Sequence, residues 1–89
     1  MAHCPYADLA DIEDVLDRIR KLEKLREKKP GFFYLKSRGF LHFHLKDDRR
    51  WADVRDGQEW GEELDIPFNP SKKQKDSFFK EVAARYENS

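Results

Sequence analysis

The chain has little of several residue types on which small proteins often depend. Cys4 is the one cysteine among 89 residues, so no disulfide can form within the chain, and apart from its neighbour His3 it has no histidine at a spacing typical of a catalytic thiol. No stretch approaches the roughly 20 apolar residues of a membrane span. The first twenty residues hold five acids where a secretory signal has an apolar segment. We therefore expect a cytoplasmic protein that makes no membrane contact.

An excess of charge of one sign is also absent. Eighteen Lys and Arg residues balance 18 Asp and Glu residues, which argues against nucleic acid or an anionic membrane as the partner. The two signs are unevenly placed near the start, where five acids in residues 8–17 precede seven bases in residues 18–29. That order complements the dipole of a single helix.

Aromatic and charged residues are what the chain has in abundance. Seven Phe, three Tyr and two Trp can each bury a large apolar area, which offsets a charged content of 40% and predicts a folded chain. A chain of 89 residues has room for one core. We therefore expect a single domain over residues 1–89, with frayed ends at residues 1–7 and 87–89.

Apolar spacing predicts a helix at each end of the chain. The first begins at the N-cap Asp8 and carries a stripe from Leu9 to Leu22, and the chain leaves the helix before Pro30. The second begins with the capping box Ser71-Lys-Lys-Gln74. Its stripe consists of Phe78/Phe79, Val82 and Tyr86.

Between these helices the apolar period changes to two. Strands are predicted at residues 32–36, 40–46 and 51–55, with turns at 37–39, 47–50 and 56–57. A fourth strand follows, and its register is open: a two-residue turn points Glu59 at the apolar face, whereas a three-residue loop sends Trp60, Leu64 and Ile66 there. We prefer the longer loop, with Gly61 as a possible bulge site. The predicted fold class is α+β, in the order helix, four-stranded antiparallel β-meander, helix, with both helices packed on one sheet face.

The predicted register follows from keeping one face of the sheet apolar. It aligns Leu35 with Leu41, Phe33 with Phe43, and Phe43 with Val54. The apolar face then consists of Phe33, Leu35, Leu41, Phe43, Leu45, Ala52 and Val54. The opposite face is the candidate binding face, and it consists of Phe32, Tyr34, Phe40, His42, His44, Trp51, Asp53 and Arg55.

His42 and His44 are the strongest candidates for metal binding or catalysis. They share one face of a strand, with Cβ atoms roughly 7 Å apart, and the predicted register places Asp53 opposite His44 and Arg55 opposite His42. A carboxylate–histidine pair beside a second imidazole can bind a metal ion or transfer a proton. A metal needs a third ligand, for which Asp53, Asp65 and Glu63 are the candidates. The favoured interpretation is plainer: two half-exposed histidines bonded to cross-strand neighbours, with no catalytic role assigned.

The candidate binding face also indicates an interaction surface, because large exposed apolar patches usually mark one. The alternative is that a helix or the N-terminal segment covers this face. Aromatics interleaved with Arg38, Arg49, Arg50 and Arg55 are suited to stacking on bases, but acids on the third and fourth strands make nucleic acid unlikely.

The leading hypothesis is therefore a non-enzymatic binding module without a cofactor, whose partner is a protein, a second copy of the chain or a small molecule. One alternative is a metal-assisted or acid–base enzyme that uses His42, His44 and Asp53. Another is a protein that binds single-stranded nucleic acid.

Residues 29–86 resemble a group of short bacterial proteins. The similarity lies in Pro30-Gly31-Phe32-Phe33-Tyr34, then Phe40-Leu41-His42-Phe43-His44, then Ala52-Asp53-Val54, with a closing helix. Those proteins are uncharacterised, so the resemblance supports the α+β prediction and implies no activity.

Overall fold

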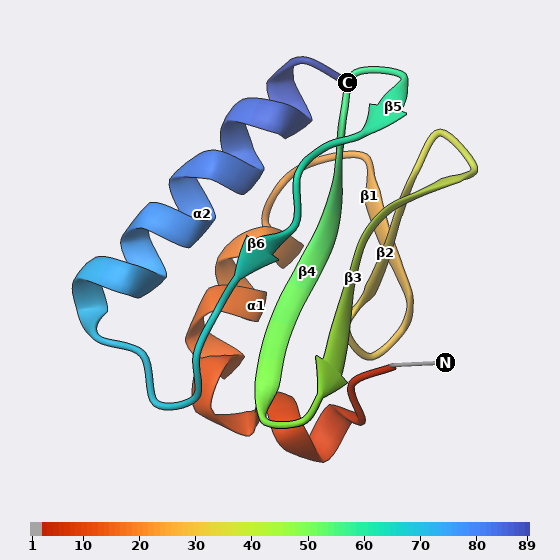
Figure 1. Ribbon diagram of the computed structural model, residues 1–89. Helices are drawn as coiled ribbons and strands as arrows, with labels where there is room; N and C mark the ends of the chain where they lie inside the picture. The colour runs from red at the N-terminus through yellow and green to blue at the C-terminus, as the bar shows by residue number, and fades with distance from the viewer. Residues whose placement is uncertain (1–2) are drawn as a thin grey trace.

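The computed structural model describes residues 3–89 and has an α+β fold (Figure 1). An antiparallel sheet of six strands and two α-helices confirms the predicted class, but the predicted count of four strands is too low. The predicted fraying of residues 1–7 falls partly on residues 1 and 2, which lie outside the described part. In chain order the elements are the 3₁₀ helix η1 (Tyr6–Ile12), α1 (Glu13–Arg20), β1 (Leu25–Lys29), β2 (Phe32–Leu35), β3 (Arg38–Lys46), β4 (Arg49–Asp56), β5 (Glu59–Trp60), β6 (Leu64–Asp65) and α2 (Lys72–Glu87).

The first helix is shorter than predicted. It ends at Arg20, and the next charged stretch forms the edge strand β1 in place of a continuing helix. Lys24 has a φ of 74°, which turns the chain away from the helical direction. Arg20 then clamps Glu27 of β1 through Nε, 2.6 Å from Oε1. This tertiary pairing outweighs the helical propensity of a Lys- and Glu-rich segment.

The predicted strand registers are wrong by two residues, and by three where Tyr34 and Leu35 pair with β3 next to the turn. Phe33 lies opposite Leu41, Leu41 opposite Val54, and Phe43 opposite Ala52. The cause is turn length: the β2–β3 and β3–β4 connections are tight two-residue turns, at Lys36-Ser37 and Asp47-Asp48, where longer loops were predicted. A shift of two preserves which face each side chain occupies, so most of the face assignment survives.

Phe40 is the exception on the candidate binding face. Tyr34 pairs with Gly39 while Phe33 pairs with Leu41, so Phe40 is the extra residue of a β-bulge. Its ring is fully buried in the core and meets Tyr86 edge-on at a centroid distance of 6.2 Å. Phe40 therefore stabilises the fold and is not available to a ligand.

The region after β4 also differs from the preferred prediction. Asp56 pairs with Glu59, so the connection is the two-residue turn Gly57-Gln58. β5 and β6 then follow the same edge of β4, separated at Gly61, whose N–H donates to the Val54 carbonyl at 2.8 Å. Ile66 is buried and Leu64 packs against the core, as predicted, whereas Trp60 is 43% exposed on the opposite side of the sheet.

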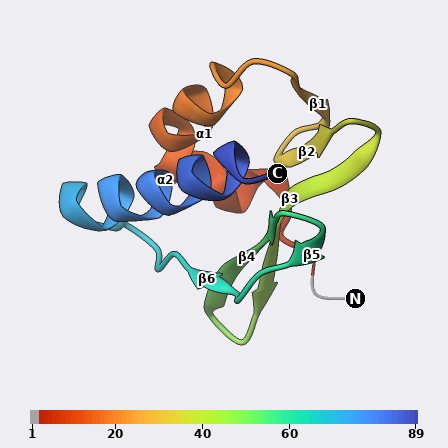
Figure 2. The ribbon, with the colours of Figure 1, turned by 90° about the horizontal axis from the view of Figure 1, so that it is seen from above.

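The closing helix α2 matches the sequence. Ser71 and Gln74 form the predicted capping box, and Phe78 and Val82 are buried. Phe79 and Tyr86 pack against the same core. Seen from above, α1 and α2 lie roughly on one side of the sheet (Figure 2). Their apolar side chains meet the inward residues of β2, β3 and β4 in one core.

Candidate functional site

The sheet face that points away from the helices is the candidate site, and we call it the open face. Seven of its residues are half-buried, and Trp60 is exposed. Among the described residues no helix crosses this face, and His3 reaches its rim by pairing with His44. The open face consists of Phe32, Tyr34, His42, His44, Trp51, Asp53, Arg55 and Trp60.

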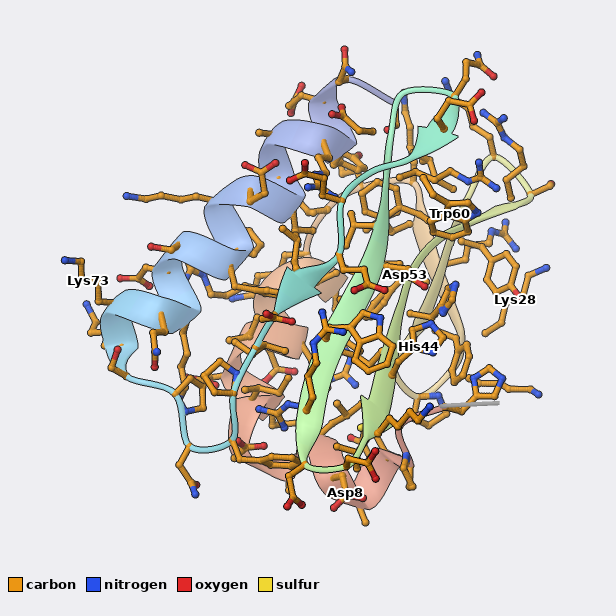
Figure 3. All side chains as sticks on the ribbon, viewed as in Figure 1. Asp8, Lys28, His44, Asp53, Trp60 and Lys73 are labelled. Atoms are coloured by element: carbon orange, nitrogen blue, oxygen red, sulfur yellow. The ribbon has the colours of Figure 1, made fainter. Side chains whose placement is uncertain are left out.

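Two histidines and one aspartate converge at its centre. Figure 3 shows His44 and Asp53 on neighbouring strands there. His42 lies directly opposite Asp53, and His44 lies opposite Trp51. The two imidazole centroids are 4.6 Å apart, and His44 Nε2 approaches Asp53 Oδ2 to 2.9 Å across the diagonal. One ligand atom from each of the three side chains lies within 4.8 Å of the other two.

One nitrogen atom at this centre has no partner. His42 Nδ1 is buried and makes no hydrogen bond to any residue in the described part of the chain. His44 Nε2 is also buried and lies 2.9 Å from Asp53 Oδ2, a distance that suits an N–H donating to the carboxylate. Buried polar atoms are nearly always paired, so the unpaired His42 Nδ1 beside the His44–Asp53 pair is suited to a ligand.

Aromatic rings hold the two imidazoles in place. Phe32 stacks on His42 with centroids 6.1 Å apart, and Trp60 meets the same ring edge-on at 5.1 Å. Trp51 stacks on His44 at 5.2 Å. Both tryptophans are themselves covered by guanidinium groups, Trp51 by Arg49 and Trp60 by Arg55. The histidines are thus oriented by packing, as a preorganised site requires.

Burial lowers the pKa of His42, and the neighbouring imidazoles of His44 and His3 lower it further, against an opposing effect of Asp53. The ring is therefore neutral at pH 7. Neutral imidazole is the form that coordinates a metal ion.

The sequence predicted most of this group but not its pairing. His42, His44 and Asp53 were the three named candidates, but Asp53 lies opposite His42 and not opposite His44 as predicted, and Trp51, not Arg55, is the other cross-strand partner. Glu63 and Asp65, the other candidate ligands, instead bind Arg49 at 2.7 and 2.8 Å. Trp60 was predicted on the apolar face, which is wrong, because the turn before it has two residues and not three.

Arg55 was placed on this face and lies there, where it donates to the carbonyls of Gly39 and Gln58. Its guanidinium is therefore engaged by the backbone as well as by the Trp60 ring.

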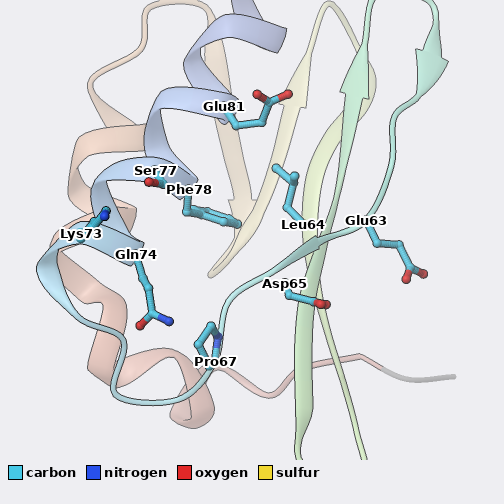
Figure 4. A pocket seen from close by; sticks show the side chains of 9 residues that line it. All are labelled: Glu63, Leu64, Asp65, Pro67, Lys73, Gln74, Ser77, Phe78 and Glu81. Atoms are coloured by element: carbon cyan, nitrogen blue, oxygen red, sulfur yellow. The ribbon is translucent and has the colours of Figure 1, made fainter.

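A hollow of about 510 Å³ lies away from the open face, between β6 and α2 (Figure 4). Phe78 and Leu64 line it together with three carboxylates, from Glu63, Asp65 and Glu81. None of the residues that the sequence singled out as binding or metal-ligating lines this hollow, apart from Glu63 and Asp65, which are paired to Arg49.

Comparisons with protein-family models, with curated proteins and with solved structures find no match for this chain. None of the described helices has the length and apolar character to cross a membrane.

Proposed function

We propose that this protein is a binding module whose open face holds a divalent transition-metal ion through His42, His44 and Asp53. The observation that carries the proposal is the convergence of one ligand atom from each of these three side chains within 4.8 Å of the other two. Imidazole and carboxylate ligands suit Zn²⁺, Fe²⁺ and Ni²⁺. Ligands about 2.1 Å from a tetrahedral zinc ion lie roughly 3.4 Å apart, so small side-chain rotations accommodate the ion.

Zinc titration tests the proposal directly. Near-stoichiometric Zn²⁺ is expected to shift the imidazole resonances of His42 and His44. His44→Gln is expected to weaken zinc binding by more than about 100-fold, since loss of an outer-shell partner alone costs 10- to 100-fold. Asp53→Asn keeps the side-chain shape, removes the carboxylate charge and is expected to weaken binding as well.

His3→Gln is the matched control. His3 stacks on His44 at a centroid distance of 5.8 Å but is not one of the three converging side chains. Its removal is expected to leave zinc affinity within a few-fold of the original. Absence of any resonance shift at equimolar zinc contradicts the proposal. A loss in His3→Gln as large as that in His44→Gln points to an amino-terminal site instead.

A metal-assisted enzyme is the second candidate. It is favoured by the number of ligands, because three protein ligands leave a coordination position for water, whereas structural zinc sites use four. Zinc lowers the pKa of such a water and makes it a nucleophile near neutral pH. Hydrolysis of para-nitrophenyl acetate that requires both zinc and His44 would favour the enzyme, and its absence would favour the binding module.

A further inference from the structure

Another hollow, also of about 510 Å³, lies between β1 and the β2–β3 turn. Its volume is in the range of about 300–1,000 Å³ that is typical of small-molecule sites. No acidic side chain lines it. The lining consists of Lys24, Arg26, Lys28, Tyr34, Lys36 and Ser37.

The four cations of this hollow are not neutralised by the protein. None of them forms an ion pair with a residue in 3–89, whereas Arg20, Arg49 and Arg50 are each held by carboxylates. Glu23 and Glu87 line a neighbouring hollow that shares Lys24 and Lys36, but neither glutamate pairs with them.

Lys28 Nζ lies over the Tyr34 ring, 4.6 Å from its centroid, in a cation–π contact. Four unpaired cations in one concavity create a positive potential in a chain of zero net charge.

The turn that closes the hollow has an unusual sequence for its conformation. Lys36 and Ser37 have φ values of 54° and 68°, in the left-handed region that a two-residue hairpin turn requires. Asn-Gly and Asp-Gly are favoured in such turns, and the equivalent turn at Asp47-Asp48 uses a residue type that tolerates this region. Lys36 and Ser37 are therefore in an unfavourable backbone conformation. Residues in such conformations are often found at functional sites.

We propose that this hollow binds a small anion that carries several phosphate groups, such as the triphosphate of a nucleotide. Lysine ammonium groups supply point charges, the Arg26 guanidinium supplies a bidentate fork, and the Ser37 hydroxyl supplies a further donor. A longer nucleic-acid strand fits less well, because the opposite edge of the sheet, where β6 pairs with β4, carries the acidic residues Glu62, Glu63 and Asp65. This site is separate from the metal ligands and does not depend on them.

The first test measures tripolyphosphate binding by calorimetry in a buffer with EDTA, so that no metal ion bridges protein and phosphate. Arg26→Gln combined with Lys28→Gln is expected to weaken binding by roughly 10- to 100-fold, because it removes two of the four cations, including the Arg26 fork. Lys72→Gln combined with Lys73→Gln removes the same charge from the start of α2 and is expected to leave binding nearly unchanged. Equal losses in the two pairs overturn the proposal, as does absence of binding to the unmodified protein.

The second test exploits the two turns. Lys36→Asn with Ser37→Gly is expected to raise the unfolding midpoint and to weaken tripolyphosphate binding at least about fivefold, because it relieves the turn and removes a cation and a hydroxyl. Asp47→Asn with Asp48→Gly is expected to raise the midpoint without weakening binding. Retained affinity in the first variant contradicts the assignment of the turn to the site. Tighter binding of a thymidine 12-mer than of tripolyphosphate, with a steep salt dependence, would identify a nucleic-acid surface and overturn the small-anion proposal.

Discussion

At the scale of single residues, Arg50 connects the segment that follows β6 to the 3₁₀ helix η1. Its side chain is fully buried, and Nη1 contacts Asp11 Oδ1 at 2.7 Å. Nε donates to the carbonyl of Ile66 and Nη2 to that of Pro67. The sequence predicts Arg50 in a turn and on a base-stacking surface, and both predictions are wrong because Arg50 lies buried in β4. The alternation of the strand nonetheless indicates its position. Arg50 precedes Ala52 by two residues and Val54 by four, so all three side chains point to the apolar face.

Replacement of Arg50 by methionine is expected to destabilise the protein by about 3–5 kcal/mol, because the Asp11 carboxylate and several carbonyls lose their buried partner. The adjacent Arg49 is the control. It is 48% exposed and pairs with Glu63 and Asp65 at the surface, so Arg49→Met is expected to destabilise the protein far less than Arg50→Met. Urea unfolding of the two variants checks the difference. Similar losses in both would show that the guanidinium of Arg50 does not anchor the core.

The same contact predicts an acid dependence of stability. The hydrogen bond from Arg50 lowers the pKa of Asp11 in the folded state, and the Asn69 N–H adds to this effect. A carboxyl with a lowered folded pKa stabilises the protein above its unfolded pKa of about 3.9, and this contribution is lost as the pH falls through the folded pKa.

Asp11→Asn is therefore expected to reduce stability at pH 7 and to flatten the decline below pH about 4. The slope is expected to persist in part, because Asp14 and Glu27 also have lowered pKa values, through Lys75 and Arg20 respectively. Unfolding free energies measured between pH 7 and pH 3 check this, and an unchanged acid slope would contradict it.

At the scale of elements, the sequence specified which faces the strands present better than which residues they pair with. Period-two alternation fixes the face of each side chain, and beyond the bulge at Phe40 the error of two residues left that parity intact. For that reason His42, His44 and Asp53 were expected on one face and are found there. Turn length could not be read in the same way, because Lys36-Ser37 lacks the Asn or Gly that marks a tight hairpin turn.

The helices show the same contrast between local and tertiary signals. α2 was predictable, since its capping box and apolar stripe act within a few residues of each other. β1 was not, because residues 21–29 have helical composition and become a strand only through pairing with β2 and the Arg20–Glu27 contact. The bulge at Phe40 is likewise a property of the assembled sheet.

At the scale of the whole molecule, stability is expected to vary from the centre of the sheet to its edges. β3 and β4 pair along most of their length and carry the buried residues Leu41, Phe43, Ala52 and Val54. β1 pairs only with β2, and Leu25 is its one apolar side chain, which is partly buried. Amides in β1 are therefore expected to exchange with solvent at least roughly 100-fold faster than those of β3, since local opening ranges from nearly no free energy to that of global unfolding.

Hydrogen exchange with each ligand then separates the two proposed sites. Tripolyphosphate is expected to slow exchange in β1 and the β2–β3 turn, because the cations of its hollow come from these segments. Zinc is expected to slow exchange in β3 and β4 near His44 and Asp53 and to leave β1 unchanged. If zinc protected β1, or if β1 and β3 exchanged equally slowly in the free protein, the sheet would open as one unit. The two sites would then be coupled through it, and ligand effects on one could not be assigned independently of the other.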